Sequence, residues 1–322
     1  MVSAPEERRN ELRGAAKALS REIGAEALRA LHREDRRLDI LTIVVLWSLI
    51  ALCFVLLGAL PLGLPFLLVL CLQGFALLAL GFCAHDLFIH RRVGGERLAP
   101  HLANLCLFPL GILGADYEAS HRDHHWYLGT ARDGESYKED LDRRWVKLLL
   151  LFGPTSLLVL FGLCRRRGAP PPPRPERPPE HGARLRREGL QLAAFLALVG
   201  VALCLWPRLV FCGYVLPTLT SLPLASAVRL VLEHGESAPD NPYHVATCYH
   251  LGPLTGPLFL WSVGDAHLIH HLFPNIPFYR LGAARRLLLP ALLRHGVVER
   301  RSLSFLLYGW FVKNRRHATA WR

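Results

Sequence analysis

Four long apolar runs divide this chain. Residues 40–60 and 64–84 are almost wholly apolar, and only three residues separate them. A helix needs about 20 mainly apolar residues to cross the hydrocarbon of a bilayer, so these runs predict two spans in a tight hairpin. Residues 190–206 and 209–228 predict a second hairpin that turns at Pro207. The pattern predicts an all-α integral membrane protein with four transmembrane helices.

Three further apolar segments, residues 102–115, 148–164 and 251–263, are too short or too interrupted to be ordinary spans. We expect them to be re-entrant or interfacial. The second is followed by a Pro/Arg-rich loop, residues 165–187. Basic loops stay on the cytosolic side of a membrane, so we expect residues 148–164 to dip into the bilayer and return. Four spans then leave both termini in the cytosol.

The segment before the first span, residues 1–39, has nine Lys and Arg residues and carries apolar residues at helical spacing, namely Leu12, Ala16, Leu19, Ile23 and Leu31. We interpret it as a cytosolic amphipathic helix lying on the membrane surface. The predicted organisation is this N-terminal segment, a membrane domain over residues 40–285, and a basic cytosolic tail over residues 286–322.

Composition agrees with a membrane protein. The chain has 38 Lys and Arg against 26 Asp and Glu, a net charge of +12, yet 52% of its residues are hydrophobic. Because the basic residues fall in the gaps between apolar blocks, they indicate water-facing loops and no nucleic-acid partner. The eight cysteines include no C-x-x-C pair, so neither a disulfide framework nor a cysteine-ligated zinc or iron–sulfur site is predicted.

Histidines form three clusters outside the four runs. One is H-x4-H and two are H-x2-H-H, and their members are His85 and His90, then His121, His124 and His125, then His267, His270 and His271. Residues at i, i+3 and i+4 share one helix face, so one helix can present imidazoles to two adjacent metals. Eight clustered histidines exceed what one tetrahedral ion uses. Two metals are predicted, and imidazole suits iron, zinc or copper.

The first cluster has a different spacing. His85 and His90 are about 140° apart on an α-helix, so we expect them to serve different metals or to straddle a frayed helix end. Four acidic residues near the clusters are candidates to accept the second ring N–H of a ligand histidine: Asp86, Asp123, Glu233 and Asp265.

Other candidates have ordinary explanations. His244 and His250, in NPYHVATCYH, are interpreted as surface or structural residues. Glu118 and His121 form half of the soluble di-iron carboxylate pattern, but the second E-x-x-H is missing.

The order of these clusters, with hairpin spans before and between them, resembles the membrane fatty acid desaturase superfamily over about residues 40–285. The stretches that carry the resemblance are AHDLFIHRR, SHRDHHWYLGT, RLVLEHGE and GDAHLIHHLFPNIPFYRL. It implies an oxidoreductase with two non-haem iron ions that uses O2 and external electrons to introduce a double bond into a fatty acyl chain of a lipid or thioester.

By the same resemblance, the iron ligands are the eight clustered histidines and His234, which precedes the third cluster. The full set is His85, His90, His121, His124, His125, His234, His267, His270 and His271. Some acyl-CoA members have an asparagine shortly before the upstream histidine, which holds a water on one iron. Leu230 stands four residues before His234 here, so that water ligand is not expected.

Three alternative functions differ in what they require of the sequence. A lipid or carotenoid hydroxylase or ketolase of the same superfamily fits the histidine pattern equally well. A metal transporter or metal sensor should carry ionisable ligands inside its spans, but every histidine lies outside the four runs. A membrane zinc protease needs H-E-x-x-H, which does not occur in this sequence.

The chain shows no cysteine pattern for an iron–sulfur cluster and no flavin-binding or cytochrome-like segment. We therefore expect a separate electron donor, a ferredoxin, a rubredoxin or a b-type cytochrome, besides the acyl substrate and membrane lipids. Residues 165–187 and the tail around Arg300, Arg301, Lys313, Arg315 and Arg316 are candidate docking surfaces for it. The expected location is multi-pass, with the active site facing the cytosol, in a bacterial inner membrane.

Overall fold

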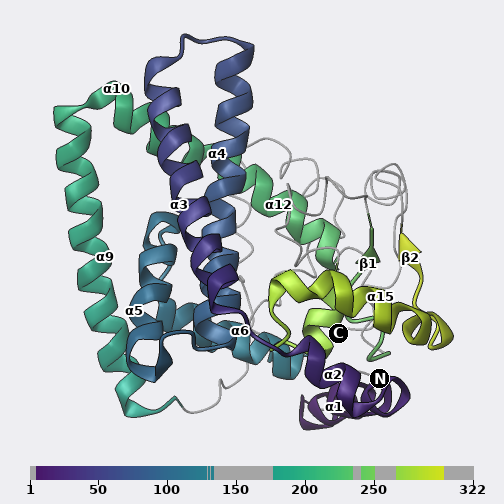
Figure 1. Cartoon of the computed structure of the whole chain (residues 1–322). Helices are drawn as coiled ribbons and strands as arrows, with labels where there is room; N and C mark the ends of the chain where they lie inside the picture. Colours follow the sequence, from purple (N-terminus) through teal and green to yellow (C-terminus); the bar gives the residue numbers. More distant parts are fainter. Residues whose placement is uncertain are drawn as a thin grey trace.

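The computed structural model describes residues 5–128, 130, 132–133, 177–234, 241–250 and 266–300. Helices dominate this part of the chain (Figure 1). The first hairpin consists of α3 (Arg36–Ala59) and α4 (Leu64–Cys83), close to the predicted runs. The Asp35 side chain caps α3 by accepting a hydrogen bond from the Arg37 backbone N–H at 2.9 Å.

The second hairpin begins with α9 (Pro179–Leu205) and returns through four helical segments that run from Pro207 to His234. These are α10 (Pro207–Val210), the π-helical η4 (Phe211–Val215), α11 (Leu216–Leu219) and α12 (Ser221–His234). The two hairpins meet closely at Gly74, where a Cβ atom would lie 2.5 Å from the backbone carbon of Ser221. Gln73 adds a buried hydrogen bond, since its Nε2 donates to the Gly213 carbonyl at 3.0 Å.

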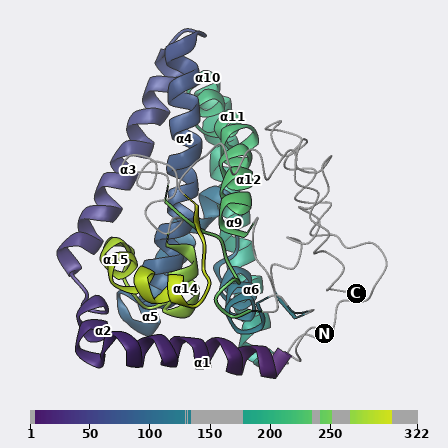
Figure 2. The same ribbon diagram turned by 90° about the vertical axis from the view of Figure 1, so that its right-hand side faces the viewer.

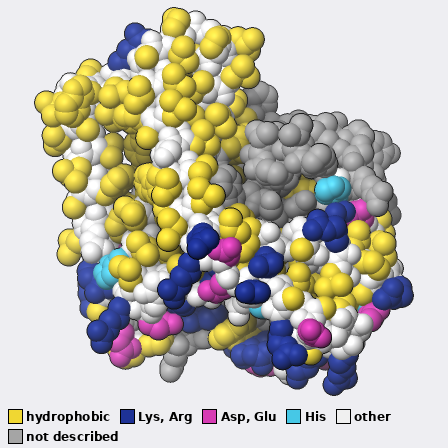
Figure 3. All heavy atoms as spheres, in the orientation of Figure 1, with side chains coloured by type: hydrophobic (Ala, Val, Ile, Leu, Met, Phe, Trp, Pro, Cys, Tyr) yellow, Lys and Arg dark blue, Asp and Glu magenta, His cyan; other side chains and the backbone are white. Residues whose placement is uncertain are grey.

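Charged and apolar side chains separate along these helices. In Figure 3, hydrophobic side chains cover the part of the surface formed by the α3–α4 and α9–α10 hairpins, and charged side chains gather at the opposite end. Ile40, Leu64 and Leu190 are 63%, 69% and 75% exposed. Among the described residues, four helices are long and apolar enough to cross a membrane, or five if the bent pair α5–α6 counts as one span. The predicted all-α membrane fold with two hairpins is confirmed.

A sharply bent pair of helices follows the first hairpin. It consists of α5 (Gly95–Leu107), the short 3-10 turn η2 (Phe108–Leu110) and α6 (Gly114–Tyr127), with a bend of 96°. The Asn104 side chain fastens the bend because its Oδ1 accepts a hydrogen bond from the Gly114 N–H at 3.0 Å. The segment expected to be re-entrant or interfacial, residues 102–115, falls in this bend.

The N-terminal segment lies across the end of the molecule that carries the charged residues. It forms α1 (Pro5–Ile23) and α2 (Ala25–Leu31), which Gly24 separates in a left-handed conformation with φ +88°. Figure 2 shows α1 passing beneath α14 and α15. Its apolar stripe packs on protein, and Leu19 is fully buried. Neighbouring helices thus cover this stripe, and the location of the segment on the membrane surface stays a prediction.

The last described residues of the chain, 241–250 and 266–300, lie beside the N-terminal segment. The elements there are β1 (Cys248–Tyr249), α14 (His267–Leu272), α15 (Phe278–Arg294) and β2 (Glu299–Arg300). The two short strands pair in parallel, with Cys248 opposite Glu299. The boundary predicted after residue 285 falls inside α15. The segments 148–164 and 251–263, residues 165–176 of the Pro/Arg-rich loop, and residues 301–322 lie outside the described residues.

Candidate metal centre

The first histidine cluster lies on a helix that changes its winding. Beyond Cys83, α4 continues as the π-helical segment η1 (Ala84–His90). Hydrogen bonds in a π-helix join residues i and i+5, so residues five apart lie above one another. His85 and His90 therefore face the same way and belong to one group of ring nitrogens. The expectation of different metals or a frayed helix end, based on α-helical winding, is wrong.

The two H-x2-H-H clusters each divide between two groups. On α6, His121 and His125 lie together, whereas His124 lies in the neighbouring group. On α14, His267 and His271 lie together and His270 joins the other group. The residues that stay together are four apart and so share a helix face. The prediction that one helix serves two adjacent sites matches this arrangement.

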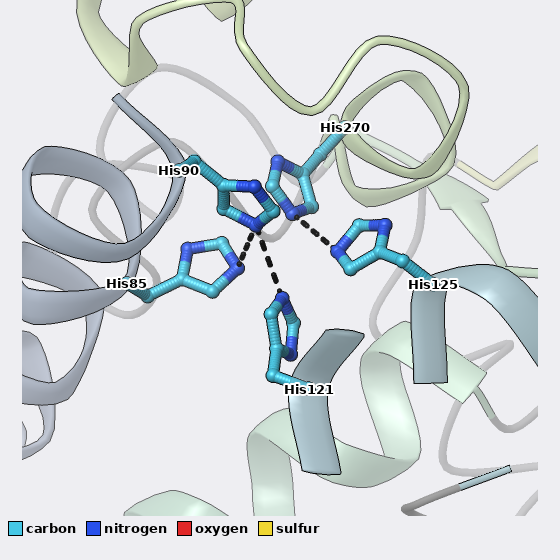
Figure 4. A group of neighbouring side chains, drawn as sticks. All are labelled: His85, His90, His121, His125 and His270. Carbon is cyan, nitrogen blue, oxygen red and sulfur yellow. Dashed lines mark hydrogen bonds between the residues drawn. The ribbon is translucent and has the colours of Figure 1, made fainter. Parts of the chain in front are cut away.

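We call the larger set the first histidine group; it comprises His85, His90, His121, His125 and His270. Figure 4 shows their rings converging from η1, α6 and α14. The Nε2 atom of His90 lies 3.2 Å from that of His85 and 3.1 Å from that of His121. The Nε2 atoms of His125 and His270 are 3.2 Å apart. Five imidazoles thus share one small volume.

We call the other set the second histidine group; it comprises His124, His234, His267 and His271, all buried. His234 is the last residue of α12, and its Nε2 lies 2.8 Å from that of His267. In each group the ligand atoms lie within 4.8 Å of one another. The groups adjoin, since the ring centroids of His125 and His271 are 4.7 Å apart. All nine predicted site histidines are therefore brought together.

These distances fit a metal-binding site. A metal–nitrogen bond of about 2.1 Å with ligands at right angles places neighbouring nitrogens about 3.0 Å apart. Five Nε2 pairs within the two groups measure 2.8 to 3.2 Å. One proton can sit between two nitrogens, but His90 approaches two neighbours at once. A cation satisfies all of these converging lone pairs together.

Electrostatics keeps the rings in the protonation state that a metal needs. Burial, assisted by the neighbouring imidazoles, lowers the pKa of His270 and His271 well below its ordinary value. Neutral imidazole is the ligand form of histidine. One residue from each group therefore offers a free lone pair at neutral pH.

Carboxylates support the second group. His124 Nδ1 lies 2.7 Å from Asp133 Oδ1, so its N–H donates to a buried carboxylate. Glu233 accepts a hydrogen bond from Arg229 at 2.7 Å and lies 3.7 Å from His267 Nδ1, too far for a hydrogen bond, so the hydrogen-bonded carboxylate in this group is Asp133. Such partners fix the ring orientation and raise the basicity of a ligand. Sequence reasoning named Glu233 but missed Asp133.

The other acidic candidates have different partners. Asp86 accepts a hydrogen bond from Arg91 at 3.0 Å, and Asp123 pairs with Arg177. The prediction that these two carboxylates orient ligand histidines is corrected, and Asp265 lies outside the described residues. His244 and His250 belong to neither histidine group.

A buried ion cluster holds the end of η1. Arg91, which follows His90, donates to Asp39 on α3 at 2.6 Å as well as to Asp86. All three side chains are at most 3% exposed. Burial by itself lowers the pKa of Arg91, but the two carboxylates raise it above its ordinary value, so the guanidinium stays charged. The guanidinium carbon of Arg91, Cζ, also lies 5.7 Å from the ring centre of Tyr279 on α15. The cluster joins three elements around the first group.

Fold and site together define a helical membrane protein whose two adjacent histidine groups fit a metal-binding site at the end of its apolar helices. The family model described as "Fatty acid desaturase" matches residues 60–302, and the chain therefore belongs to the fatty acid desaturase family. A comparison with curated proteins finds no relative that matches. Membership makes the protein an oxidoreductase of this membrane superfamily.

Proposed function

We propose that this protein is a membrane-bound di-iron oxidoreductase that introduces a double bond into the fatty acyl chain of a lipid or thioester. The observation that carries the proposal is the convergence of nine histidines into two adjoining groups where α4 and α12 end. A hydrocarbon substrate needs apolar surroundings and the metals need polar ligands. The ends of apolar helices provide both.

The first histidine group would hold one iron and the second group the other. Bound iron would activate O2 for removal of hydrogen from an unactivated acyl chain. The protein's own contribution is to keep the imidazoles neutral and aimed. Asp133 holds His124 by its Nδ1–H, and Arg91 fastens the turn that follows His90.

The reaction balances with external electrons. The acyl chain loses two hydrogen atoms, and O2 takes up those two, two electrons and two protons to give two water molecules. We propose a separate donor for the electrons, a ferredoxin, a rubredoxin or a b-type cytochrome. The Lys and Arg residues that precede the first span favour a site facing the cytosol, and we propose a bacterial inner membrane as the location.

The test is mass spectrometry of total lipids from a host that makes this protein together with a compatible donor. The comparison strain makes His270→Ala, which removes one member of the first group. His101→Ala is the matched control, because His101 is an exposed histidine outside both groups. We expect an acyl species lighter by two hydrogens with the wild type and with His101→Ala.

The His270→Ala strain should lack that species. A product heavier by one oxygen, with the same dependence on His270, would replace desaturation by hydroxylation. The oxidoreductase assignment would be rejected by two results together: identical lipids in all strains, and no iron in the purified wild-type protein.

A further inference from the structure

A cavity of about 690 Å³ lies between α6 and the first turns of α9. It is on the outer side of α6, since its lining residues from that helix are Ala115, Glu118, Ala119 and Arg122 and include no member of either histidine group. From α9 and the residue before it come Pro178, Glu180, His181, Ala183, Arg184 and Arg187. This size is that of a small-molecule pocket.

Ion pairs between the two helices occupy several of the charges around this cavity. Arg184 donates to Glu118 at 2.8 Å and to the buried Glu188 at 2.7 Å. Glu188 in turn accepts a hydrogen bond from the Ala115 N–H at 2.7 Å. Glu118 also pairs with Arg92. These contacts hold α9 against α6, the helix that carries His121, His124 and His125.

Two arginines in the lining have no such partner. Arg122 lies over the ring of Trp126 at 5.6 Å, and neither it nor Arg187 forms an ion pair with any residue in the described part of the chain. Both are exposed. His181 lines the same cavity. An arginine fork matches the oxygens of a phosphate group, so the free guanidinium groups favour an anionic ligand that carries phosphate.

The position of the cavity selects the source of that phosphate. Arg187 precedes Leu190 by three residues, which is about 4.5 Å along the helix. From Leu190 onward α9 exposes apolar side chains, among them Leu198, which is 70% exposed. The arginines therefore lie at the level of lipid headgroups, with the surface for acyl chains directly beyond them. Basic pockets between membrane helices bind anionic headgroups.

We propose that this cavity binds the phosphate headgroup of an anionic phospholipid whose acyl chains lie along α9. The site goes beyond the proposed oxidoreductase function and does not depend on it. A concave pocket beside an exposed apolar helix suits a lipid better than an acidic electron donor or a soluble phosphate compound.

The test titrates purified protein in detergent with phosphatidylglycerol and follows the retained lipid by native mass spectrometry. Arg122→Gln and Arg187→Gln should each weaken binding about fivefold. Arg186→Gln is the matched control, because Arg186 is the next residue on the same helix, is exposed, and does not line the cavity. We expect it to change binding by less than about twofold, and phosphatidylcholine to bind weakly to all forms.

Three results would overturn the proposal. Equal losses in Arg187→Gln and Arg186→Gln, or no loss in either, would mean that only general surface charge attracts the lipid. Displacement of phosphatidylglycerol by coenzyme A, with the same dependence on Arg122, would assign the site to a soluble phosphate compound. Slower reduction by an acidic ferredoxin with unchanged lipid binding would assign it to the donor.

Discussion

The two histidine groups adjoin, yet different chemistry holds them in place. In the first group, the buried Nδ1 atoms of His85 and His125 have no hydrogen-bond partner among the described residues. In the second group, His124 bonds to the carboxylate of Asp133 and His267 lies near Glu233. Ring packing and the backbone of η1 both contribute to holding the first group. In the second, His124 has a hydrogen-bonded carboxylate behind it, whereas the Nδ1 of His271 has no hydrogen-bond partner among the described residues.

Because of this difference, we expect the two adjacent metal sites to differ in metal affinity. A carboxylate behind an imidazole raises its basicity and strengthens metal binding. The second group should therefore hold its ion more tightly. The first group should depend on whatever fixes η1, which in this structure is the buried cluster of Arg91, Asp39 and Asp86.

The largest expected effect comes from breaking that cluster. Arg91→Met leaves Asp39 and Asp86 buried without their cation, so the free energy of unfolding should fall by about 3–5 kcal/mol. Thermal unfolding in detergent measures it, and exposed Arg97→Met is the control. The ion in the first group should be lost before that in the second. If Arg91→Met unfolds like Arg97→Met, the cluster does not secure η1.

Both histidine groups are buried, and the dependence of protein stability on pH tests the effect of that burial. The pKa of His270 and His271 is lowered in the folded protein, so the unfolded chain takes up protons near pH 6.5 that the folded chain refuses. Stability of the metal-free protein should be full above about pH 6.5. Below it, each histidine should cost about 1.4 kcal/mol per pH unit.

Apparent melting temperatures at a series of pH values between about 7.5 and 5.5 check this dependence. His270→Gln should make it shallower, and His101→Gln, at an exposed position, should leave it unchanged. A melting temperature that stays constant across the range would show that burial does not control the two rings.

A smaller effect distinguishes the groups directly. Asp133→Asn keeps the shape of the side chain but removes its charge from behind His124, so one of the two ions should bind about 10–100-fold more weakly. Competition with a chelator measures both ions, and Asp116→Asn, an exposed position on α6, is the control. Equal weakening of both ions would mean that Asp133 acts on the whole fold and not on the second group.

Much of the fold followed from the sequence because apolar runs and helical spacing are local. The hairpin at residues 40–60 and 64–84 became α3 and α4 within a few residues. The histidine boxes could be found because i, i+3 and i+4 spacing has one geometric meaning. His85 and His90 misled because nothing local indicated a π-helix, which realigns residues five apart.

Other features depend on contacts that are distant in the sequence. Asp133 reaches His124 from beyond the end of α6, where no periodicity places it. The N-terminal stripe was correctly seen as helical, but its partners on α14 and α15 lie more than 200 residues away. Asp86 looked like a partner for a histidine because it adjoins one, whereas its carboxylate bonds to Arg91. Spacing alone does not choose between such neighbours.

Counting the metal ions bound per chain shows whether the nine histidines form two metal sites. Elemental analysis of purified protein should give two iron ions for the wild type and for His101→Ala. We expect one for His90→Ala in the first group, one for His234→Ala in the second, and none for the double variant. Loss of both ions in each single variant, or a wild type that holds one ion or none, would contradict the account.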